Sequence, residues 1–518
     1  MTASSVSKLY SAELEGIDAR LVEVETDVNV GLHTFTIVGL ADKALSEAKE
    51  RVNSALKNIG VTAPNRENRK IIVNLAPADL KKNGSHYDLP IALTYLMATG
   101  QLKDFDSENS LFIGELSLDS KIRPIQGALN IARLAKSIGK RRIFVPKDNA
   151  AEAALVPGLE VIPASSLMEL INHIEERAAI KQQEETKISH SQLGEKVDFS
   201  DVKGQEGAKR ALIIAAAGGH NVLMSGPPGT GKTMLAQALS SILPVPNIDE
   251  VVEMTQIYSS AGLLNGRPYI AIRPFRAPHQ TASAVAVMGG GQNPRPGEIS
   301  LAHRGVLFLD EVAEFRRDLL EALRQPLESG SALISRVRGN LEFPANFILV
   351  AAMNPCPCGF YRDEERDCKC SANEILRYQK KLSGPLLDRI DIQIELPRVA
   401  IEKLRREDAG SSSSFDIRNQ VASIRAMQME RFEQNKIRAI TNADLSSKEI
   451  EKFVALDSES ESLVRKMFDA NFISPRGYYR ILKVARTIAD LEGIEQVSKD
   501  HISEAFGYRV RENAENRM

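Results

Sequence analysis

The sequence has no long apolar stretch, no large charge excess and only four cysteines. No run approaches the roughly 20 apolar residues that cross a bilayer. The longest, residues 211–217, is followed at once by Gly218, Gly219 and His220. The first residues, MTASSVSKLYSAELEG, contain neither an apolar core nor a small-residue cleavage pattern. We therefore expect no secretory signal, no membrane partner and a cytoplasmic location.

The formal net charge is only -2, so the whole chain has no electrostatic signature of a nucleic-acid-binding protein. A DNA channel needs only a local basic lining, and net charge therefore decides nothing about DNA. Hydrophobic residues make up 43% and charged residues 26%, which is the balance of ordinary globular proteins. At roughly 150 residues per domain, 518 residues indicate about three domains.

The pattern of apolar residues changes along the chain. Short strand-like runs at 21–24, 35–38, 70–74 and 142–145 alternate with helical patterns at 42–59 and 126–138, which predicts an α/β or α+β domain. Later, strands and helices alternate around nucleotide motifs, as in a parallel sheet covered by helices. The last part has helical patterns at 420–432, 460–470, 477–491 and 499–508. The predicted segments are an N-terminal domain 1–175, a polar linker 176–197, a core 198–400, a flexible break 401–416 and a helical domain 417–518.

A phosphate-binding loop follows the apolar run NVLMS. It has the pattern G-x-x-x-x-G-K-[ST] between a strand and a helix, the context that distinguishes the motif from an ordinary glycine-rich turn. Its residues are Gly226, Pro227, Pro228, Gly229, Thr230, Gly231, Lys232 and Thr233. Backbone N–H groups and the helix N-terminus attract phosphate oxygens. We expect Lys232 to reach the β- and γ-phosphates of ATP and Thr233 to bind Mg²⁺.

Two further apolar runs end in polar residues that belong at the same sheet edge. The run GVLFLDE ends at Asp310 and Glu311, and FILVAAMN ends at Asn354. Asp310 suits the magnesium ion, and Glu311 can polarise the attacking water. Asn354 could orient that water or contact the γ-phosphate, although an asparagine before a proline also commonly begins a turn.

Together these motifs resemble the AAA+ superfamily, in particular its magnesium-chelatase-like branch and the bacterial YifB/ComM family. The resemblance covers nearly the whole chain and rests on VKGQEGAKRAL (202–212), GPPGTGKT (226–233), PFRAPHQTAS (274–283), RPGEISLAHRGVLFLDE (295–311), AAMNPCPCG (351–359), SGPLLDRIDI (383–392) and SPRGYYRILKVARTIADL (474–491). It implies an α/β fold in which a parallel-sheet AAA+ core carries a C-terminal helical lid.

The resemblance also implies roles that spacing alone does not give. Arg389 resembles an arginine finger that reaches a neighbouring subunit's ATP, which requires a closed ring and implies a homo-hexamer. Arg476 resembles a second sensor arginine delivered by the lid. Val202 and Gln205 fall in the segment that flanks adenine in such proteins. An exposed salt bridge at Arg389 and a solvated helix start at Arg476 are the alternatives.

Arginines in two segments are candidates for a DNA-facing channel. One segment is RPFRAPHQTASAVAVMGGGQNPRPGE, and the other is the apparent hairpin LISRVRGNLEF with Arg336 and Arg338 near its turn. In this branch of AAA+ proteins, such elements resemble loops that face the central channel. Guanidinium groups there could contact phosphates without reading sequence, but each could also be an ordinary exposed arginine.

All four cysteines lie in two pairs, Cys356 with Cys358 and Cys368 with Cys370. Disulfides are unexpected in the cytosol, and two pairs could form a tetrahedral Zn²⁺ site. The C-x-C spacing is less typical of zinc than C-x-x-C. Reduced cysteines in a loop remain the alternative.

The N-terminal domain resembles the Lon-protease-like fold through NLAPADLKKNGSHYDLPIAL (74–93) and GELSLDSKIRPIQGALNIARLAKSIG (114–139). At the positions of the Ser-Lys dyad this chain has Asp88 and Leu129. Ser85 and Lys136 are near in sequence but out of register. We therefore expect no proteolysis, and a role in assembly or DNA engagement.

These features favour an ATP-dependent hexameric DNA motor, with helicase or branch-migration activity in recombination or natural transformation. One alternative is a motor subunit that drives magnesium insertion into a porphyrin, although such motors generally lack the Lon-like domain. The other is an ATPase that remodels proteins.

Overall fold

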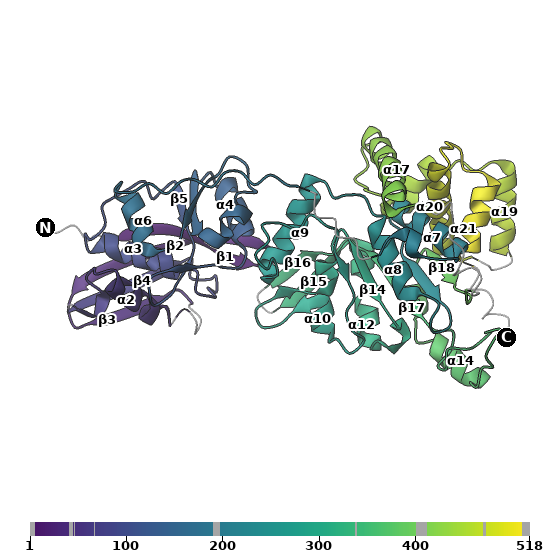
Figure 1. The fold of residues 1–518 in the computed structure, drawn as a ribbon, viewed down its shortest axis with the longest axis horizontal. Coiled ribbons are helices and arrows are strands. Elements are labelled where there is room, and N and C mark those ends of the chain that lie inside the picture. Colours follow the sequence, from purple (N-terminus) through teal and green to yellow (C-terminus); the bar gives the residue numbers. More distant parts are fainter. Residues whose placement is uncertain are drawn as a thin grey trace. The chain divides into compact units, whose positions relative to one another are not determined.

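The computed structural model describes residues 6–40, 45, 47–66, 68–189, 197–336, 339–399, 412–469 and 473–509. These residues form two compact units (Figure 1). The first comprises Met1–Ser189, Ile248–Ala271 and Pro294–Pro296, and the second comprises His190–Asn247, Ile272–Asn293 and Gly297–Met518. Residues 190–196 of the predicted linker and 401–411 of the predicted break lie outside the described residues. The predicted domain boundaries stay predictions.

The first unit is built on a four-stranded sheet in the order β1-β2-β4-β3. Its strands are β1 (Ser7–Glu15), β2 (Asp18–Val30), β3 (Thr34–Val38) and β4 (Arg69–Ala76). Only β3 and β4 run parallel, and the other neighbours are antiparallel. The almost completely buried helix α3 (Asp88–Ala98) packs on β1 and β2, and α2 (Ala48–Asn58) packs on α3. The strands predicted at 21–24, 35–38 and 70–74 are thereby confirmed.

A smaller parallel sheet in the order β5-β8-β9 completes the first unit. Its strands are β5 (Ser110–Phe112), β8 (Arg142–Pro146) and β9 (Glu160–Ala164), and a short hairpin joins β6 (Glu115–Leu116) to β7 (Ile122–Arg123). The helices are α4 (Ala128–Ser137), α5 (Ala150–Ala153) and α6 (Leu167–Ile174). This confirms the mixed α/β character and the predicted strand at 142–145. The Lon-protease-like fold stays a prediction for this region.

Helix α9 (Ile248–Ala261) belongs to the first unit although it follows the phosphate-binding loop in sequence. It packs on α4. The Gly127 N–H donates to the Ser259 carbonyl at 3.1 Å, and the Ser259 hydroxyl pairs with the buried Glu152 carboxylate. Burial raises the pKa of Glu152, and hydrogen bonds from Ser259 oppose this effect. A segment inserted in the core's sequence therefore completes the N-terminal unit.

The second unit contains a five-stranded sheet in the order β11-β14-β17-β10-β18, and every neighbouring pair is parallel. Its strands are β10 (Val222–Ser225), β11 (Phe275–Arg276), β14 (Val306–Leu309), β17 (Ile348–Met353) and β18 (Ile392–Glu395). Strands β10, β14 and β17 are completely buried, which explains their uninterrupted apolar sequences. The predicted parallel sheet is confirmed.

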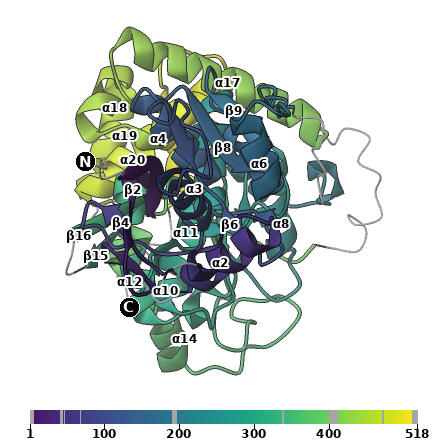
Figure 2. The same ribbon diagram turned by 90° about the vertical axis from the view of Figure 1, so that its left-hand side faces the viewer.

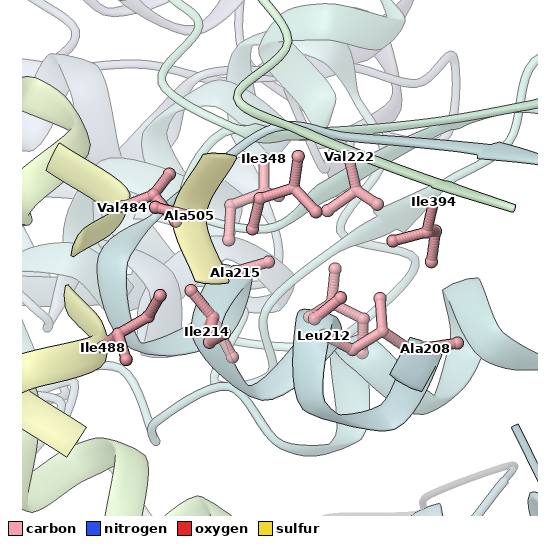
Figure 3. Close-up of a cluster of buried hydrophobic side chains, with 14 of the residues drawn as sticks. Ala208, Leu212, Ile214, Ala215, Val222, Ile348, Ile394, Val484, Ile488 and Ala505 are labelled. Carbon is pink, nitrogen blue, oxygen red and sulfur yellow. The ribbon is translucent and has the colours of Figure 1, made fainter. Parts of the chain in front are cut away.

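Helix α7 (Glu206–Gly218) lies between this sheet and the helical domain (Figure 3). The cluster that it joins includes Val222, Ile348 and Ile394 from the strands and Val484, Ile488 and Ala505 from the helices. Because α7 packs on both layers, it is apolar on most of its surface, as in the run ALIIAAAG. One continuous core therefore joins the sheet to the helical domain.

The helical domain confirms the four predicted helices and adds one. Its members are α17 (Ser414–Gln434), α18 (Ser447–Phe453), α19 (Ser458–Asp469), α20 (Pro475–Leu491) and α21 (Lys499–Gly507), grouped together in Figures 1 and 2. The additional helix α18 begins with a capping box of Ser446 and Glu449, which is a readable sequence signal. Between the helices, the buried Asp490 accepts hydrogen bonds from Arg431, Asn442 and Arg486.

The other α-helices and strands in the described part of the chain have at most 10 residues each. They are α8 (Lys232–Ser241), α10 (Ala284–Met288), β12 (Gly289–Gly290), β13 (Arg295–Pro296), α11 (Glu298–Leu301), α12 (Arg317–Ala322), α13 (Pro326–Ser329), β15 (Ser331–Arg336), β16 (Gly339–Pro344), α14 (Ala372–Gln379) and α15 (Gly384–Leu387). The antiparallel pairing of β15 with β16 confirms the predicted hairpin. Within the described ranges, no helix is long and apolar enough to cross a membrane.

Candidate functional site

The phosphate-binding loop connects β10 to α8, as its sequence predicts. Gly229 and Gly231 both have φ of 83°, a conformation that L side chains rarely adopt. A Cβ on Gly226 would lie 2.5 Å from the Leu396 carbonyl oxygen, so this position has no room for a side chain. Helix α8 begins at Lys232, and its N-terminus therefore faces the loop.

The Lys232 side chain contacts Asn354, the residue that follows strand β17. Its Nζ donates to the carbonyl oxygens of Gly226 at 2.7 Å and Pro227 at 3.0 Å, and to Asn354 Oδ1 at 3.1 Å. Burial lowers the pKa of Lys232, while the charges of Asp310 and Glu311 oppose this shift. The structure thus brings together the lysine, the two carboxylates and the asparagine that the sequence singled out.

The two carboxylates follow β14 at the same sheet edge. Thr233 donates its hydroxyl proton to Asp310 Oδ2 at 3.3 Å, and both side chains are exposed. A hydroxyl and a carboxylate are oxygen ligands of the kind that Mg²⁺ prefers. Glu311 has φ of 50°, a left-handed conformation that is costly for a residue with a side chain.

Arg389 is buried against its own subunit. Its guanidinium donates to the carbonyl oxygens of Arg324 at 3.0 Å and Pro385 at 2.5 Å, and it pairs with Glu328. Burial lowers its pKa, and the Glu328 charge opposes this shift. To reach a neighbour's phosphate, Arg389 would have to leave these contacts.

Arg476 lies in the first turn of α20 and is exposed. Its guanidinium is 3.9 Å from the Asp388 carboxylate, which places it near the Arg389 segment. A cleft of about 2170 Å³ is lined by the start of the phosphate-binding loop, the end of β17 and the Ser474–Pro475 turn before Arg476. This space is larger than the roughly 300 to 1,000 Å³ of an ordinary ligand pocket, and it borders the start of the loop rather than Lys232 or Asp310.

Val202 and Gln205 lie ahead of α7. The Val202 side chain is buried in the main core. Gln205 has φ of 58° and donates from Nε2 to the Pro397 carbonyl oxygen at 2.7 Å. This segment is thereby linked to the chain that leaves β18.

The four cysteines gather at one point after β17. All four sulfur atoms lie within 4.8 Å of one another. The Cys356 sulfur is 3.4 Å from that of Cys358 and 3.7 Å from that of Cys368. All four are free thiols, and Cys356 is the most buried. The sequence alone did not show that Cys356 and Cys358 lie beside Cys368 and Cys370.

The positions related to the protease dyad have separate partners in the first unit. Asp88 is buried and pairs with Arg51, with distances of 2.6 and 3.0 Å. Ser85 donates to the Glu115 carboxylate, while Lys136 donates to the Gly158 carbonyl oxygen at 2.8 Å. Leu129 is fully buried.

Of the candidate channel arginines, Arg276 pairs with Glu298 through two bonds of 2.6 and 2.7 Å, and Arg295 is exposed. Arg273 donates to the Pro244 carbonyl oxygen at 2.6 Å. The Arg336 side chain and the whole of Arg338 lie outside the described residues.

A buried network that the sequence did not indicate joins the core to the lid. His220 contacts Thr487 at 2.8 Å and Asp391 at 3.4 Å. Asp391 also pairs with Arg480 on α20. Burial opposes ionisation of Asp391, but the Arg480 charge and the hydrogen bond with His220 outweigh it and hold its pKa well below the usual range. No local pattern signals these contacts, because their partners are far apart in sequence.

The chain matches models of known protein families and is similar to known sequences. Three family models match it: "Magnesium chelatase, subunit ChlI" over residues 198–404, "Subunit ChlI of Mg-chelatase" over 24–149, and "Magnesium chelatase, subunit ChlI C-terminal" over 411–509. The competence protein ComM of Haemophilus influenzae is 43% identical over 511 residues, which cover 98% of each chain. This chain belongs to the YifB/ComM family. The family is a magnesium-chelatase-like group of AAA+ proteins, as the motifs predicted.

Other members and relatives agree with this family. YifB of Escherichia coli is 41% identical over 506 residues, covering 98% of this chain and 97% of its own. The magnesium-chelatase 38 kDa subunit of Rhodobacter capsulatus is 26% identical over 350 residues, covering 60% of this chain and 87% of its own. Membership in the magnesium-chelatase-like AAA+ group implies the use of ATP and Mg²⁺. Proteins of the AAA+ superfamily are commonly oligomeric.

Proposed function

We propose that this YifB/ComM protein is an ATP-driven DNA motor that works as a homo-hexameric ring in the cytoplasm, with helicase or branch-migration activity. Natural transformation or recombination is the proposed setting. The supporting observation is the similarity to a competence protein along 98% of both chains. A protein that processes incoming DNA must move along strands or exchange them, and ATP hydrolysis supplies the free energy.

The nucleotide site supports the ATPase part of this proposal. Lys232 binds the β- and γ-phosphates, exchanging its carbonyl contacts for phosphate oxygens. Thr233 and Asp310, already in contact, hold Mg²⁺. Glu311 polarises the attacking water, and Asn354 stays within reach of both the lysine and the γ-phosphate.

The ring follows from the proposed role of Arg389. A guanidinium that stabilises charge on a transferred phosphoryl group must come within hydrogen-bond reach of it. Arg389 therefore leaves Glu328 and enters the neighbouring subunit's site, while Arg476 acts from the lid of its own subunit. Val202 and Gln205 lie where the adenine side of the nucleotide would bind. DNA phosphates contact arginines in the channel, for which Arg295 is an exposed candidate.

The proposed cofactors are ATP and Mg²⁺, with Zn²⁺ as a structural ion at the four cysteines. Two pairs of thiolates are a known ligand set for tetrahedral Zn²⁺. The cluster's sulfur atoms lie within 4.8 Å of one another, a spacing that fits one ion.

A metal-chelatase motor is the second candidate. The match to the Rhodobacter chelatase subunit favours it, but that match leaves two-fifths of this chain uncovered, since it spans 60%. A subunit of such a chelatase would also need a partner that binds porphyrin. Protein remodelling is the third possibility.

The discriminating experiment measures ATP turnover and strand movement on a synthetic four-way DNA junction. We expect the junction to stimulate turnover and the purified protein to move its branch point, with Lys232→Ala as the inactive control. A purified hexamer that neither binds nor moves DNA contradicts the proposal. Stimulation by unfolded protein favours remodelling, and stimulation by a porphyrin-binding partner favours the chelatase motor.

A further inference from the structure

The cysteine cluster has the dimensions of a metal site. With metal-sulfur bonds of about 2.3 Å, a tetrahedral Zn²⁺ site separates its sulfur atoms by about 3.8 Å. The three resolved contacts among Cys356, Cys358 and Cys368 measure 3.4, 3.7 and 3.6 Å. Cys370 completes the set within 4.8 Å.

Hydrophobic packing does not explain why the two pairs meet. The chain between them, residues 359–367, reads GFYRDEERD and is rich in charge. Three of the four cysteines are only half-buried. The Tyr361 N–H donates to the Cys356 sulfur at 3.3 Å, and such donors stabilise a thiolate ligand. A soft cation shared by four thiolates is the simplest link that joins the two ends of this polar loop.

The loop begins next to the nucleotide site. Cys356 is two residues after Asn354, which accepts the Lys232 hydrogen bond at 3.1 Å. Gly359 has φ of 86°, and a Cβ at this position would lie 2.8 Å from Cδ of Pro228. The loop backbone therefore lies directly against the phosphate-binding loop. The Gly359 N–H donates to the Cys356 carbonyl oxygen at 3.0 Å, and this bond connects the Gly359 contact to the first cysteine.

The second pair is linked to the same place. Helix α14 begins at Ala372, directly after Cys370, and Ser371 caps it. At its other end, Gln379 donates from Nε2 to the Pro355 carbonyl oxygen at 3.1 Å. Arg398 pairs with Asp363 in the middle of the loop at 2.7 Å. The hydrogen bond from Gln379 thus connects the chain after the second cysteine pair to Pro355, the residue that follows Asn354.

We infer that the four cysteines bind one Zn²⁺ and that this ion positions Gly359 and Asn354 against the phosphate-binding loop, so that nucleotide affinity depends on the bound metal. The inference rests on the proposed function of that loop in ATP binding. Without the ion, the two cysteine pairs lose their bonds to one common centre. The backbone at Gly359 then loses its support, and Pro228 and Asn354 gain freedom that nucleotide binding must remove.

The test measures two quantities on the full-length protein: zinc content by mass spectrometry and affinity for a fluorescent ADP analogue. We expect one zinc per chain. Cys358→Ser is expected to bring zinc below a tenth of an equivalent and to weaken nucleotide binding about tenfold or more, because two loop contacts lose their positions. Asp367→Asn, an exposed neighbour of the cluster, is the matched control and should change neither quantity.

Two further measurements separate the effect of zinc on nucleotide affinity from a general loss of folding. Gly359→Ala retains all four ligands, so it should hold full zinc and still weaken nucleotide binding. Metal-stripped wild-type protein should regain affinity on addition of Zn²⁺ alone.

Each outcome decides a separate claim. Wild-type protein that binds nucleotide but holds less than a tenth of an equivalent of zinc overturns this inference, as does unchanged affinity in zinc-free Cys358→Ser. Lys232→Ala should lose nucleotide and keep zinc. If wild-type protein holds zinc but binds no nucleotide, the proposed ATPase fails, and the dependence of affinity on the metal fails with it, while the zinc site itself stands.

Discussion

Arg389 provides the sharpest test of the ring. A catalytic role and a structural role predict different effects of its removal on the rate of ATP hydrolysis. As an arginine finger it would accelerate hydrolysis by about 10³ to 10⁵, equal to roughly 4 to 7 kcal/mol of barrier. As a purely structural residue it would contribute only to folding stability. Arg389→Ala should bind ATP normally and hydrolyse it very slowly.

The contacts of Arg389 limit how much folding stability the protein can lose when this side chain is removed. Its ion-pair partner, Glu328, has a side chain that is 57% exposed, and such pairs typically contribute about 0 to 1 kcal/mol. The hydrogen bonds to the Arg324 and Pro385 carbonyl oxygens add about 1.5 to 3 kcal/mol each at most. These contacts affect unfolding, and the melting temperature of Arg389→Ala should fall by several degrees. They do not account for a thousandfold loss of rate in folded protein.

Glu328→Gln is the matched control, because it weakens the pair in the same subunit but leaves the guanidinium intact. A finger predicts that Glu328→Gln keeps or gains turnover, since Arg389 is released more easily. A purely structural role predicts that both variants lower the melting temperature and that the folded protein of both keeps its turnover.

The assay measures steady-state ATP turnover of single variants and of mixed rings. Arg389→Ala subunits mixed with Lys232→Ala subunits should regain turnover, because an intact phosphate-binding loop then faces an intact arginine at some interfaces. Neither parent forms that interface. Near-normal turnover of pure Arg389→Ala rejects the finger. Mixed rings that are verified by mass and stay inactive reject its action in trans or require concerted hydrolysis around the ring.

Three other predictions concern the nucleotide site and the two cores. Lys232→Ala should lose ATP binding, whereas Glu311→Gln should bind ATP and lose hydrolysis; full turnover by Glu311→Gln would assign the water to another residue. Arg51→Met should destabilise the protein by about 3 to 5 kcal/mol at pH 8, because it leaves the buried Asp88 carboxylate unpaired. Burial raises the pKa of Asp88 to about 6, despite the opposing Arg51 charge, so any stability linked to its protonation is lost as pH rises through 6. The melting-temperature difference between Arg51→Met and wild type should therefore shrink at pH 5, and an equal difference at both pH values contradicts this. Ile488→Ala, at a fully buried position, should cost about 2 to 5 kcal/mol in chemical denaturation, and a change below about 1 kcal/mol would show that the core collapses around the cavity.

The sequence by itself determined the features whose physics is local. The glycines of the phosphate-binding loop specify a backbone that few other residues adopt, and the lysine and threonine follow at the start of a helix. Apolar runs that end in Asp310 and Asn354 specify buried strands with polar ends. The capping boxes and helical periodicity likewise predicted most of the helical domain, and Ser446 with Glu449 would have given α18 as well.

Only the tertiary structure decided which distant residues meet. Lys232 and Asn354 are 122 positions apart, and their contact exists because β10 and β17 are neighbours in the sheet. The contact of Gly359 with Pro228 likewise depends on packing between separate loops. Helix α9 joins the N-terminal unit through Ser259, although the surrounding sequence belongs to the core. Periodicity reports whether a face is buried but not its partner, because many pairings bury the same apolar area.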